Sequence, residues 1–216
     1  MQFSEEEKEK LKKIIFLYAT VKDWMLYAER IHLRKEDYIQ SINGIINAFG
    51  NLTIACEHGL KSGDLATILT NLDTTLTYLY KSVYELLEGI STCLRDKIPD
   101  EIEEISKETL AKLFPKYYRE IRPDIESIPF QISNFRANKV ENIDKLNMTE
   151  LNKYIKIVEK LKFHYSEVRR IKPGLDEYER EQRSKVIKSE FWGILSYIIT
   201  GVVSMIIGAF LAEYLT

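Results

Sequence analysis

The first residues whose types and spacing could form a reactive site are Glu29 and His32, which lie three positions apart. On a helix, a carboxylate and an imidazole at this spacing point from one face, as they do in di-iron bundles. Such bundles need the pair twice, together with two further glutamates, and neither His58 nor His164 has a glutamate three residues before it. We therefore expect Glu29 and His32 to be a solvated pair rather than part of a metal site.

The consecutive residues Cys56, Glu57 and His58 are a second set of potential ligands. Successive side chains of a helix point about 100° apart, so these three cannot hold one ion together. Cys56 and Cys93 both fall on apolar stripes, and cysteine without a partner packs as a small apolar residue. We expect both cysteines to be free thiols in the core.

Sequence motifs of known catalytic sites are lacking in this chain. It has no glycine-rich phosphate loop, no serine elbow and no His-Glu-x-x-His pair. Its three histidines have no partner at a spacing that suggests general acid–base catalysis. We therefore expect a protein that is not an enzyme and that holds no cofactor and no metal ion.

Two short basic clusters are candidates for contact with an anion. Arginine binds phosphate with two parallel hydrogen bonds and aromatic rings stack on bases, so such clusters occur where proteins bind phosphate, nucleotides or lipid headgroups. The alternative, which we favour, is a solvated helix edge whose tyrosine rings pack inward. The first cluster consists of Lys116, Tyr117, Tyr118, Arg119 and Arg122, and the second of Arg169 and Arg170.

Small residues recur at every fourth position near the C-terminus. On a helix they would share one face, where a second helix can approach closely inside a membrane. The alternative is that they face lipid and pair with nothing. We expect self-association, and so a homo-oligomer, through a strip formed by Ser196, Thr200, Ser204, Gly208 and Ala212.

This strip lies in an apolar stretch, residues 191–212, that has no charged side chain. As a helix the stretch is long enough to cross a hydrocarbon core of roughly 30 Å, so we predict one transmembrane helix. No Lys or Arg follows it in the short external tail of residues 213–216, whereas five precede it: Lys172, Arg180, Arg183, Lys185 and Lys188. The positive-inside rule then places the N-terminal part in the cytoplasm. The sequence thus predicts a tail-anchored, single-pass protein of the cell membrane.

The N-terminal part of the chain carries stripes of apolar residues that alternate in steps of three and four. This period is typical of helices that pack side by side and excludes strands. The stripes predict an all-α fold, a helical bundle with heptad-like packing. Their members are Leu11, Ile14, Tyr18, Val21, Met25 and Ala28; Tyr38, Ile42, Ile45, Phe49, Leu52 and Cys56; Leu65, Leu69, Leu72, Leu76, Leu79, Val83, Leu86, Ile90 and Cys93; and Tyr154, Val158, Leu161, Tyr165 and Val168.

Capping residues and prolines predict where these helices begin and end. Ser4 followed by Glu7 forms a capping box. Pro99 should end the third helix, and three later prolines should divide residues 99–130 into short segments. Pro173, followed by glycine, should end the bundle. We therefore predict a cytoplasmic bundle at 1–171, a hinge and charged juxtamembrane helix at 172–190, the span at 191–212 and the tail at 213–216.

The charge balance limits the classes of partner. The chain has 31 Lys and Arg against 33 Asp and Glu, a net charge of -2, so no nucleic acid is expected. The first hypothesis is a membrane-tethered interaction or scaffold protein, with the bilayer and a protein as partners. The second is a membrane-acting effector whose bundle senses a signal and whose span oligomerises and permeabilises the bilayer. The third is a membrane-tethered enzyme.

Overall fold

The computed structural model describes residues 4–61, 64–143 and 148–214 of the chain. Over these residues the protein is helical and has no strand, so the predicted all-α fold is confirmed. In chain order the elements are α1 (Glu5–Arg30), the 3-10 turn η1 (Lys35–Asp37), α2 (Ile39–Leu60), α3 (Leu65–Asp100), α4 (Lys107–Leu113), the π-helical turn η2 (Tyr117–Ile121), α5 (Arg122–Ile143) and α6 (Met148–Tyr214).

Local capping fixes the starts of α1 and α3. The Ser4 hydroxyl accepts a hydrogen bond from the Glu7 amide, and the Glu7 carboxylate accepts one from the Ser4 amide. The predicted capping box is confirmed. At the start of α3 the Asp64 carboxylate accepts from the amides of Ala66 and Thr67. Such caps satisfy amides that have no partner inside the helix.

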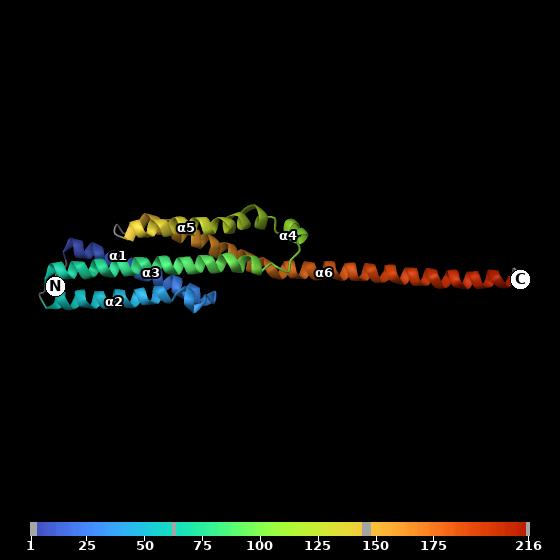
Figure 1. Cartoon of the computed structure of the whole chain (residues 1–216), viewed down its shortest axis with the longest axis horizontal. Helices are drawn as coiled ribbons and strands as arrows, with labels where there is room; N and C mark the ends of the chain where they lie inside the picture. Colours follow the sequence, from blue (N-terminus) through green and yellow to red (C-terminus); the bar gives the residue numbers. More distant parts are fainter. Residues whose placement is uncertain (1–3, 62–63, 144–147, 215–216) are drawn as a thin grey trace.

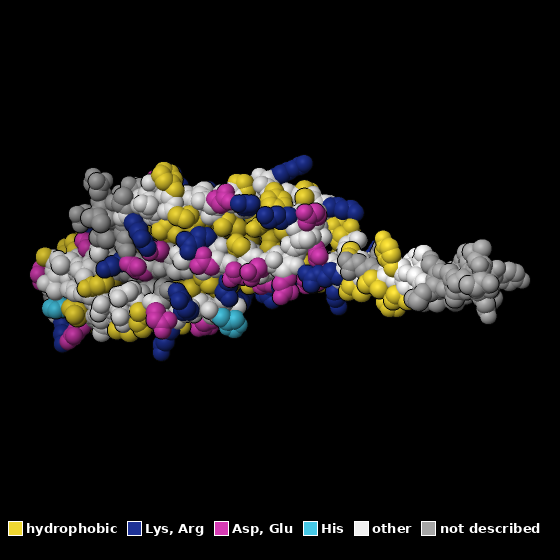
Figure 2. Space-filling view, turned by 45° about the vertical axis from the view of Figure 1, so that its right-hand side comes forward, with side chains coloured by type: hydrophobic (Ala, Val, Ile, Leu, Met, Phe, Trp, Pro, Cys, Tyr) yellow, Lys and Arg dark blue, Asp and Glu magenta, His cyan; other side chains and the backbone are white. Residues whose placement is uncertain are grey.

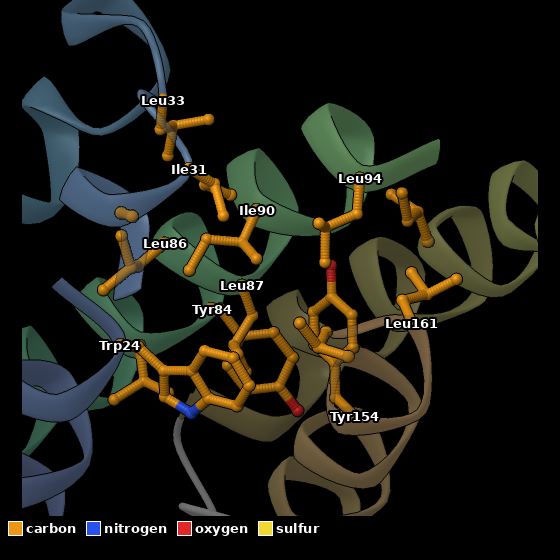
Figure 3. Packing of buried hydrophobic residues seen from close by; sticks show 14 of the residues in the cluster. Trp24, Ile31, Leu33, Tyr84, Leu86, Leu87, Ile90, Leu94, Tyr154 and Leu161 are labelled. Atoms are coloured by element: carbon orange, nitrogen blue, oxygen red, sulfur yellow. The ribbon is translucent and has the colours of Figure 1, made fainter. Parts of the chain in front are cut away.

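Helix α3 is the centre of the bundle. It packs against α1, α2, α5 and α6, and it has buried residues from Ile68 to Ile98 (Figure 1). Figure 3 shows its side chains between Trp24 of α1 and Tyr154 of α6. The third predicted stripe is confirmed from Leu72 to Ile90. At its two ends, Leu65 is exposed and Cys93 is half-buried.

Helix α2 packs on α3 through small residues rather than through its predicted stripe. Its buried positions are Ser41, Ala48 and Ala55. Gly44 lies on the same face, so close to α3 that an added Cβ would overlap the Ser82 hydroxyl. Small side chains let the two backbones approach closely. Ile45 and Leu52 of the predicted stripe are then only partly buried against the core, and other large apolar side chains of α2 are exposed. The expected burial of Phe49 and Cys56 is therefore wrong, since both are exposed.

Helix α1 follows its predicted stripe in part. Ile14, Val21 and Ala28 are buried as expected, together with Leu17 and Trp24. Tyr18 was also expected to be buried, but its side chain is 43% exposed.

Helix α6 is continuous from Met148 to Tyr214, so the predicted break at Lys172-Pro173-Gly174 is absent. A proline inside a helix costs about 3 kcal/mol. Val168 and Leu175, on either side, are fully buried, and burying two such side chains stabilises a fold by roughly 1.5–3 kcal/mol each. Packing therefore outweighs the proline. In the same way α5 runs through Pro129, which was expected to be a boundary.

The last part of α6 projects alone from the bundle, and Figure 1 places the N-terminus and the C-terminus at opposite ends of the molecule. Over the residues that the structure describes, no helix has a stretch that is long and apolar enough to cross a membrane. The predicted span covers 191–212, and the side chains of 202–212 lie outside the described part. The transmembrane helix is therefore not confirmed and stays a prediction.

Candidate functional site

An apolar cleft opens where α1 and α2 both pack on α3. The cleft has a volume of about 240 Å³, and Thr75 and Leu79 of α3 contribute to its lining. Its rim is exposed: Ile15 by 66%, Tyr18 by 43% and Phe49 by 47%. The Tyr18 and Phe49 rings meet edge to face with their centroids 5.5 Å apart. We call this feature the α1–α2 cleft.

The small-residue face of α2 is the cause of this cleft. Because α2 uses small side chains against α3, several of its larger apolar residues are left exposed: Ile46 and Ile54 as well as Phe49. Contiguous apolar surface of this kind marks places where a protein contacts another molecule. The sequence signal was present, since Ser41, Gly44, Ala48 and Ala55 are small residues at helical spacing, but we assigned the larger side chains to the core.

A buried polar network joins η2 and α5 to α6. His164 is only 3% exposed, and its Nε2 lies 2.7 Å from Asp124 Oδ2. Lys160 donates a second hydrogen bond to Asp124 at 2.8 Å. On the other side of the ring, His164 Nδ1 lies 3.8 Å from a Glu167 oxygen, and Lys116 donates to both oxygens of Glu167 at 2.7 and 2.8 Å.

The charges of this network hold Asp124 ionised. Burial alone raises the pKa of Asp124, but the hydrogen bonds from Lys160 and His164 outweigh burial, so that the pKa lies below its ordinary value. An ionised carboxylate can only accept hydrogen bonds, so His164 Nε2 carries the hydrogen and donates it to Asp124. His164 Nδ1 has no hydrogen-bond partner among the described residues. Because the imidazole is buried, the network can fix α5 against α6, but a substrate cannot reach it.

Sequence reasoning missed the partner of His164. The spacing that we considered was a glutamate three residues before the histidine. Asp124 instead lies 40 residues before His164 and belongs to another helix. Only the antiparallel packing of α5 and α6 brings the two side chains together.

The first predicted basic cluster is spread over several environments. Lys116 is paired with Glu167 and its Nζ also lies 5.2 Å from the Phe163 ring centroid. The Tyr117 ring is buried and contacts Tyr118 edge to face at 5.2 Å.

Two cations of that cluster point outward. The Arg122 Nε donates to Glu126 at 2.7 Å, and Arg119 is exposed with no salt-bridge partner among the described residues. Most of the charge of this cluster is thus already paired. Its contact with an anionic ligand stays a prediction.

The remaining candidate ligands do not come together. Helix α1 ends at Arg30, and His32 follows with φ of 52°, so Glu29 and His32 share no helix face. Cys56 and Cys93 form no disulfide and lie far apart in the sequence. In the described part of the chain no group of three His, Cys, Asp or Glu side chains lies close enough to hold a metal ion.

The predicted small-residue strip begins in the described part of α6. Ser196 and Thr200 are exposed, and the Thr200 hydroxyl donates to the Ser196 carbonyl at 2.8 Å. Ser204, Gly208 and Ala212 have side chains outside the described residues. Figure 2 shows apolar side chains on the part of α6 that leaves the bundle, and the large ones there are more than half exposed: Phe191, Trp192, Ile194, Tyr197, Ile198 and Ile199.

One comparison with known proteins gives a match. The family model for apolipoprotein B100, insert 9 arm domain, matches residues 21–188. No curated protein and no solved structure matches the chain. The matched range takes in the last part of α1 from Val21 onward, all of α2 to α5 and the part of α6 up to Lys188, and it stops before the apolar residues 191–212.

Proposed function

Since the chain belongs to the family of the apolipoprotein B100 insert 9 arm domain, we propose that its helical bundle is itself an arm, a non-catalytic spacer that a membrane anchor holds at one end. The anchor is the apolar end of α6, and the bundle lies on the cytoplasmic side of the cell membrane. The far end of the bundle binds a protein partner.

The observation that carries this proposal is the bare apolar end of α6. Phe191 and Trp192 are 62% and 66% exposed, and Ile198 and Ile199 are 57% and 55% exposed. Successive residues point about 100° apart, so apolar side chains face several directions around the helix. A helix that is apolar on all sides needs an apolar environment, which a bilayer provides.

The length of α6 fits an arm. Its 67 residues correspond to about 100 Å at 1.5 Å per residue. Because the helix is unbroken, a movement or load at the bundle reaches the apolar end through one rigid element. The name of the family likewise calls the apolipoprotein domain an arm.

Fractionation of cells tests the anchor. The full chain should sediment with membranes and remain there after an alkaline carbonate wash. Ile198→Glu with Ile199→Glu should release it, because a charge near the bilayer centre costs about 2.5–3.5 kcal/mol. Deleting only residues 213–216 is the matched control and should change nothing. Full-length chain that stays in the supernatant without detergent would refute the anchor.

The α1–α2 cleft is the surface that we assign to the protein partner. Its volume of about 240 Å³ suits one or two apolar side chains, and interfaces gain most of their energy from such anchored residues. The cleft is lined by α1, α2 and α3, and α1 and α2 lie away from the apolar end of α6, where a membrane would not cover them (Figure 1).

Crosslinked pull-down from native membranes tests this surface. Phe49→Glu should remove a specific band, because it puts a charge at the rim of the cleft. Phe130→Glu is the matched control, since Phe130 is 71% exposed on α5. A band that both variants retain, or that both lose, would contradict the assignment.

Self-association of the anchor is a separate part of the proposal. Ser204→Leu with Gly208→Leu should abolish the signal in a membrane two-hybrid assay, because leucine would keep the two helices apart. Met205→Leu, which changes a neighbouring residue without adding bulk to the strip, is the control. An unchanged signal from the double variant would count against the strip.

A further inference from the structure

A second hollow lies where α1 ends against the first third of α6. Its volume is about 430 Å³, which is in the range of sites for small molecules. Tyr27 and Arg30 line it from α1, and Tyr165, Ser166, Arg169 and Arg170 line it from α6. We call it the α1–α6 pocket.

Positive charge dominates this pocket. Arg30 and Arg170 are exposed, and neither has a salt-bridge partner among the residues that the structure describes. The Arg169 guanidinium lies 5.7 Å from the Tyr165 ring centroid, which fixes its position over an aromatic face. At the edge of the pocket the Lys162 ammonium lies 4.6 Å from the Tyr27 ring centroid. Cations therefore approach the pocket from two helices.

The acid next to the pocket is already engaged. Glu101 lies 3.4 Å from Lys172 Nζ and 3.7 Å from Arg169 Nε, and it accepts a hydrogen bond from the Tyr165 hydroxyl at 3.2 Å. Its single negative charge is shared among these three groups. It therefore cannot also neutralise Arg30 and Arg170, and the pocket keeps a net positive charge.

The aromatic lining adds a second kind of recognition. Tyr27 and Tyr165 present ring surface next to the arginines. The Tyr27 hydroxyl oxygen is buried and has no hydrogen-bond partner among the described residues. The pocket therefore presents the ring of Tyr27, rather than its hydroxyl, to a ligand.

We propose that the α1–α6 pocket binds a soluble, phosphate-bearing molecule of nucleotide size. Its phosphates lie between Arg30, Arg169 and Arg170, because arginine donates paired hydrogen bonds to phosphate oxygens. Its apolar or aromatic body lies against the tyrosine rings. Such a ligand joins α1 to α6 and so ties the first helix of the bundle to the long helix of the arm.

Lipid headgroups share the phosphate chemistry, but the position of the pocket argues against them. Arg170 precedes Phe191 by about 21 residues, which corresponds to roughly 30 Å along α6. If residues 191–212 lie in a bilayer, the pocket is too far from the headgroup layer. A soluble ligand has no such restriction.

Calorimetric titration of the full chain in detergent micelles tests this inference. ATP without magnesium, and inorganic pyrophosphate, are the probes. We expect both to bind, and ATP to bind more tightly because pyrophosphate has no body to lie on the rings. Arg30→Gln with Arg170→Gln should lower the affinity for ATP at least tenfold. Tyr27→Leu, which removes the aromatic ring, should lower it severalfold.

The matched control removes the same charge elsewhere on α6. Arg180→Gln with Arg183→Gln changes two exposed arginines outside the pocket and should leave the affinity for ATP unchanged. Helical circular dichroism identical to that of the unmodified chain establishes that each variant is folded.

Three results would overturn the inference. The first is that neither ATP nor pyrophosphate binds at millimolar concentration. The second is that the control pair lowers the affinity as much as the pocket pair does. The third is that only phosphatidylcholine vesicles containing a phosphoinositide bind, and lose binding on Arg30→Gln with Arg170→Gln, since the ligand would then be a headgroup rather than a soluble molecule.

Discussion

Replacing Asp124 with alanine should destabilise the protein by more than the loss of a surface ion pair. Asp124 is the partner of His164 Nε2 at 2.7 Å, and the His164 side chain is only 3% exposed. His164 Nδ1 already has no hydrogen-bond partner among the described residues. After the substitution both nitrogens of a buried ring would be without a partner.

The magnitude follows from two contributions. Losing a buried hydrogen bond to a charged group costs roughly 1.5–3 kcal/mol. The ion pair with Lys160, whose side chain is 60% exposed, adds at most about 1 kcal/mol. We therefore expect Asp124→Ala to lower the free energy of unfolding by about 2–4 kcal/mol.

Urea unfolding of the full chain in detergent, followed by circular dichroism, measures this change. Lys160→Ala removes only the exposed partner and should cost about 1 kcal/mol or less. Asp124→Asn keeps an acceptor oxygen and should fall between the two. If Asp124→Ala costs no more than Lys160→Ala, then the buried hydrogen bond does not stabilise the fold, and the reasoning is refuted.

The dependence of this stabilisation on pH gives a second test. The pKa of folded Asp124 is lowered from its ordinary value of 3.8. Ionised Asp124 therefore stabilises the fold fully above about pH 3.8, and the stabilisation is lost as the pH falls through the lower folded pKa. The difference in unfolding free energy between the unmodified chain and Asp124→Asn should shrink in that acidic range. A difference that grows on acidification would contradict the assignment.

Three further predictions concern packing. Gly44→Ala should lower the unfolding temperature, because the added Cβ would overlap the Ser82 hydroxyl. Adding Ser82→Ala should restore or exceed the original unfolding temperature, since alanine favours a helix over glycine by about 1 kcal/mol. If the second substitution does not restore it, the close approach of α2 to α3 is contradicted. Tyr154→Ala should lower the free energy of unfolding in urea by about 3–5 kcal/mol, and Tyr154→Phe by about 1 kcal/mol or less. The reason is that the buried ring, rather than the long contact of its hydroxyl with Ser91, stabilises the core. Equal losses for the two variants would refute this. Glu179→Ala should speed hydrogen exchange at the Ser106 amide, which now donates to Glu179 at 2.9 Å, and an unchanged rate would show that this contact does not hold α4.

The stripes of α3 and α6 were predictable because their burial follows from spacing alone. Leu76, Val83 and Ile90 on α3, and Val158 and Leu161 on α6, are all buried. Each of these helices packs large side chains toward the centre of the bundle. In that arrangement the most apolar face of the helix is also its buried face.

Helix α2 shows where this reasoning fails. Its apolar residues cover more than one face, and spacing does not say which face meets the core. Gly44 and Ala48 allow a close approach to α3, which outweighs the burial that Phe49 would gain by facing inward. The α1–α2 cleft follows from this choice and could not be predicted from the larger side chains.

The sequence by itself determined the helical fold, the capped start of α1, and the charge-free stretch at 191–212, because each depends on neighbours within a few positions. Only the tertiary structure decided that Asp124 meets His164, that α1 and α6 bring three arginines to one pocket, and that α6 continues through Pro173. These features depend on which helices pack side by side. Helix pairing depends on the burial of side chains, the close approach of backbones and the cost of backbone distortion, summed over distant parts of the chain. The spacing of residues within one helix does not contain this information.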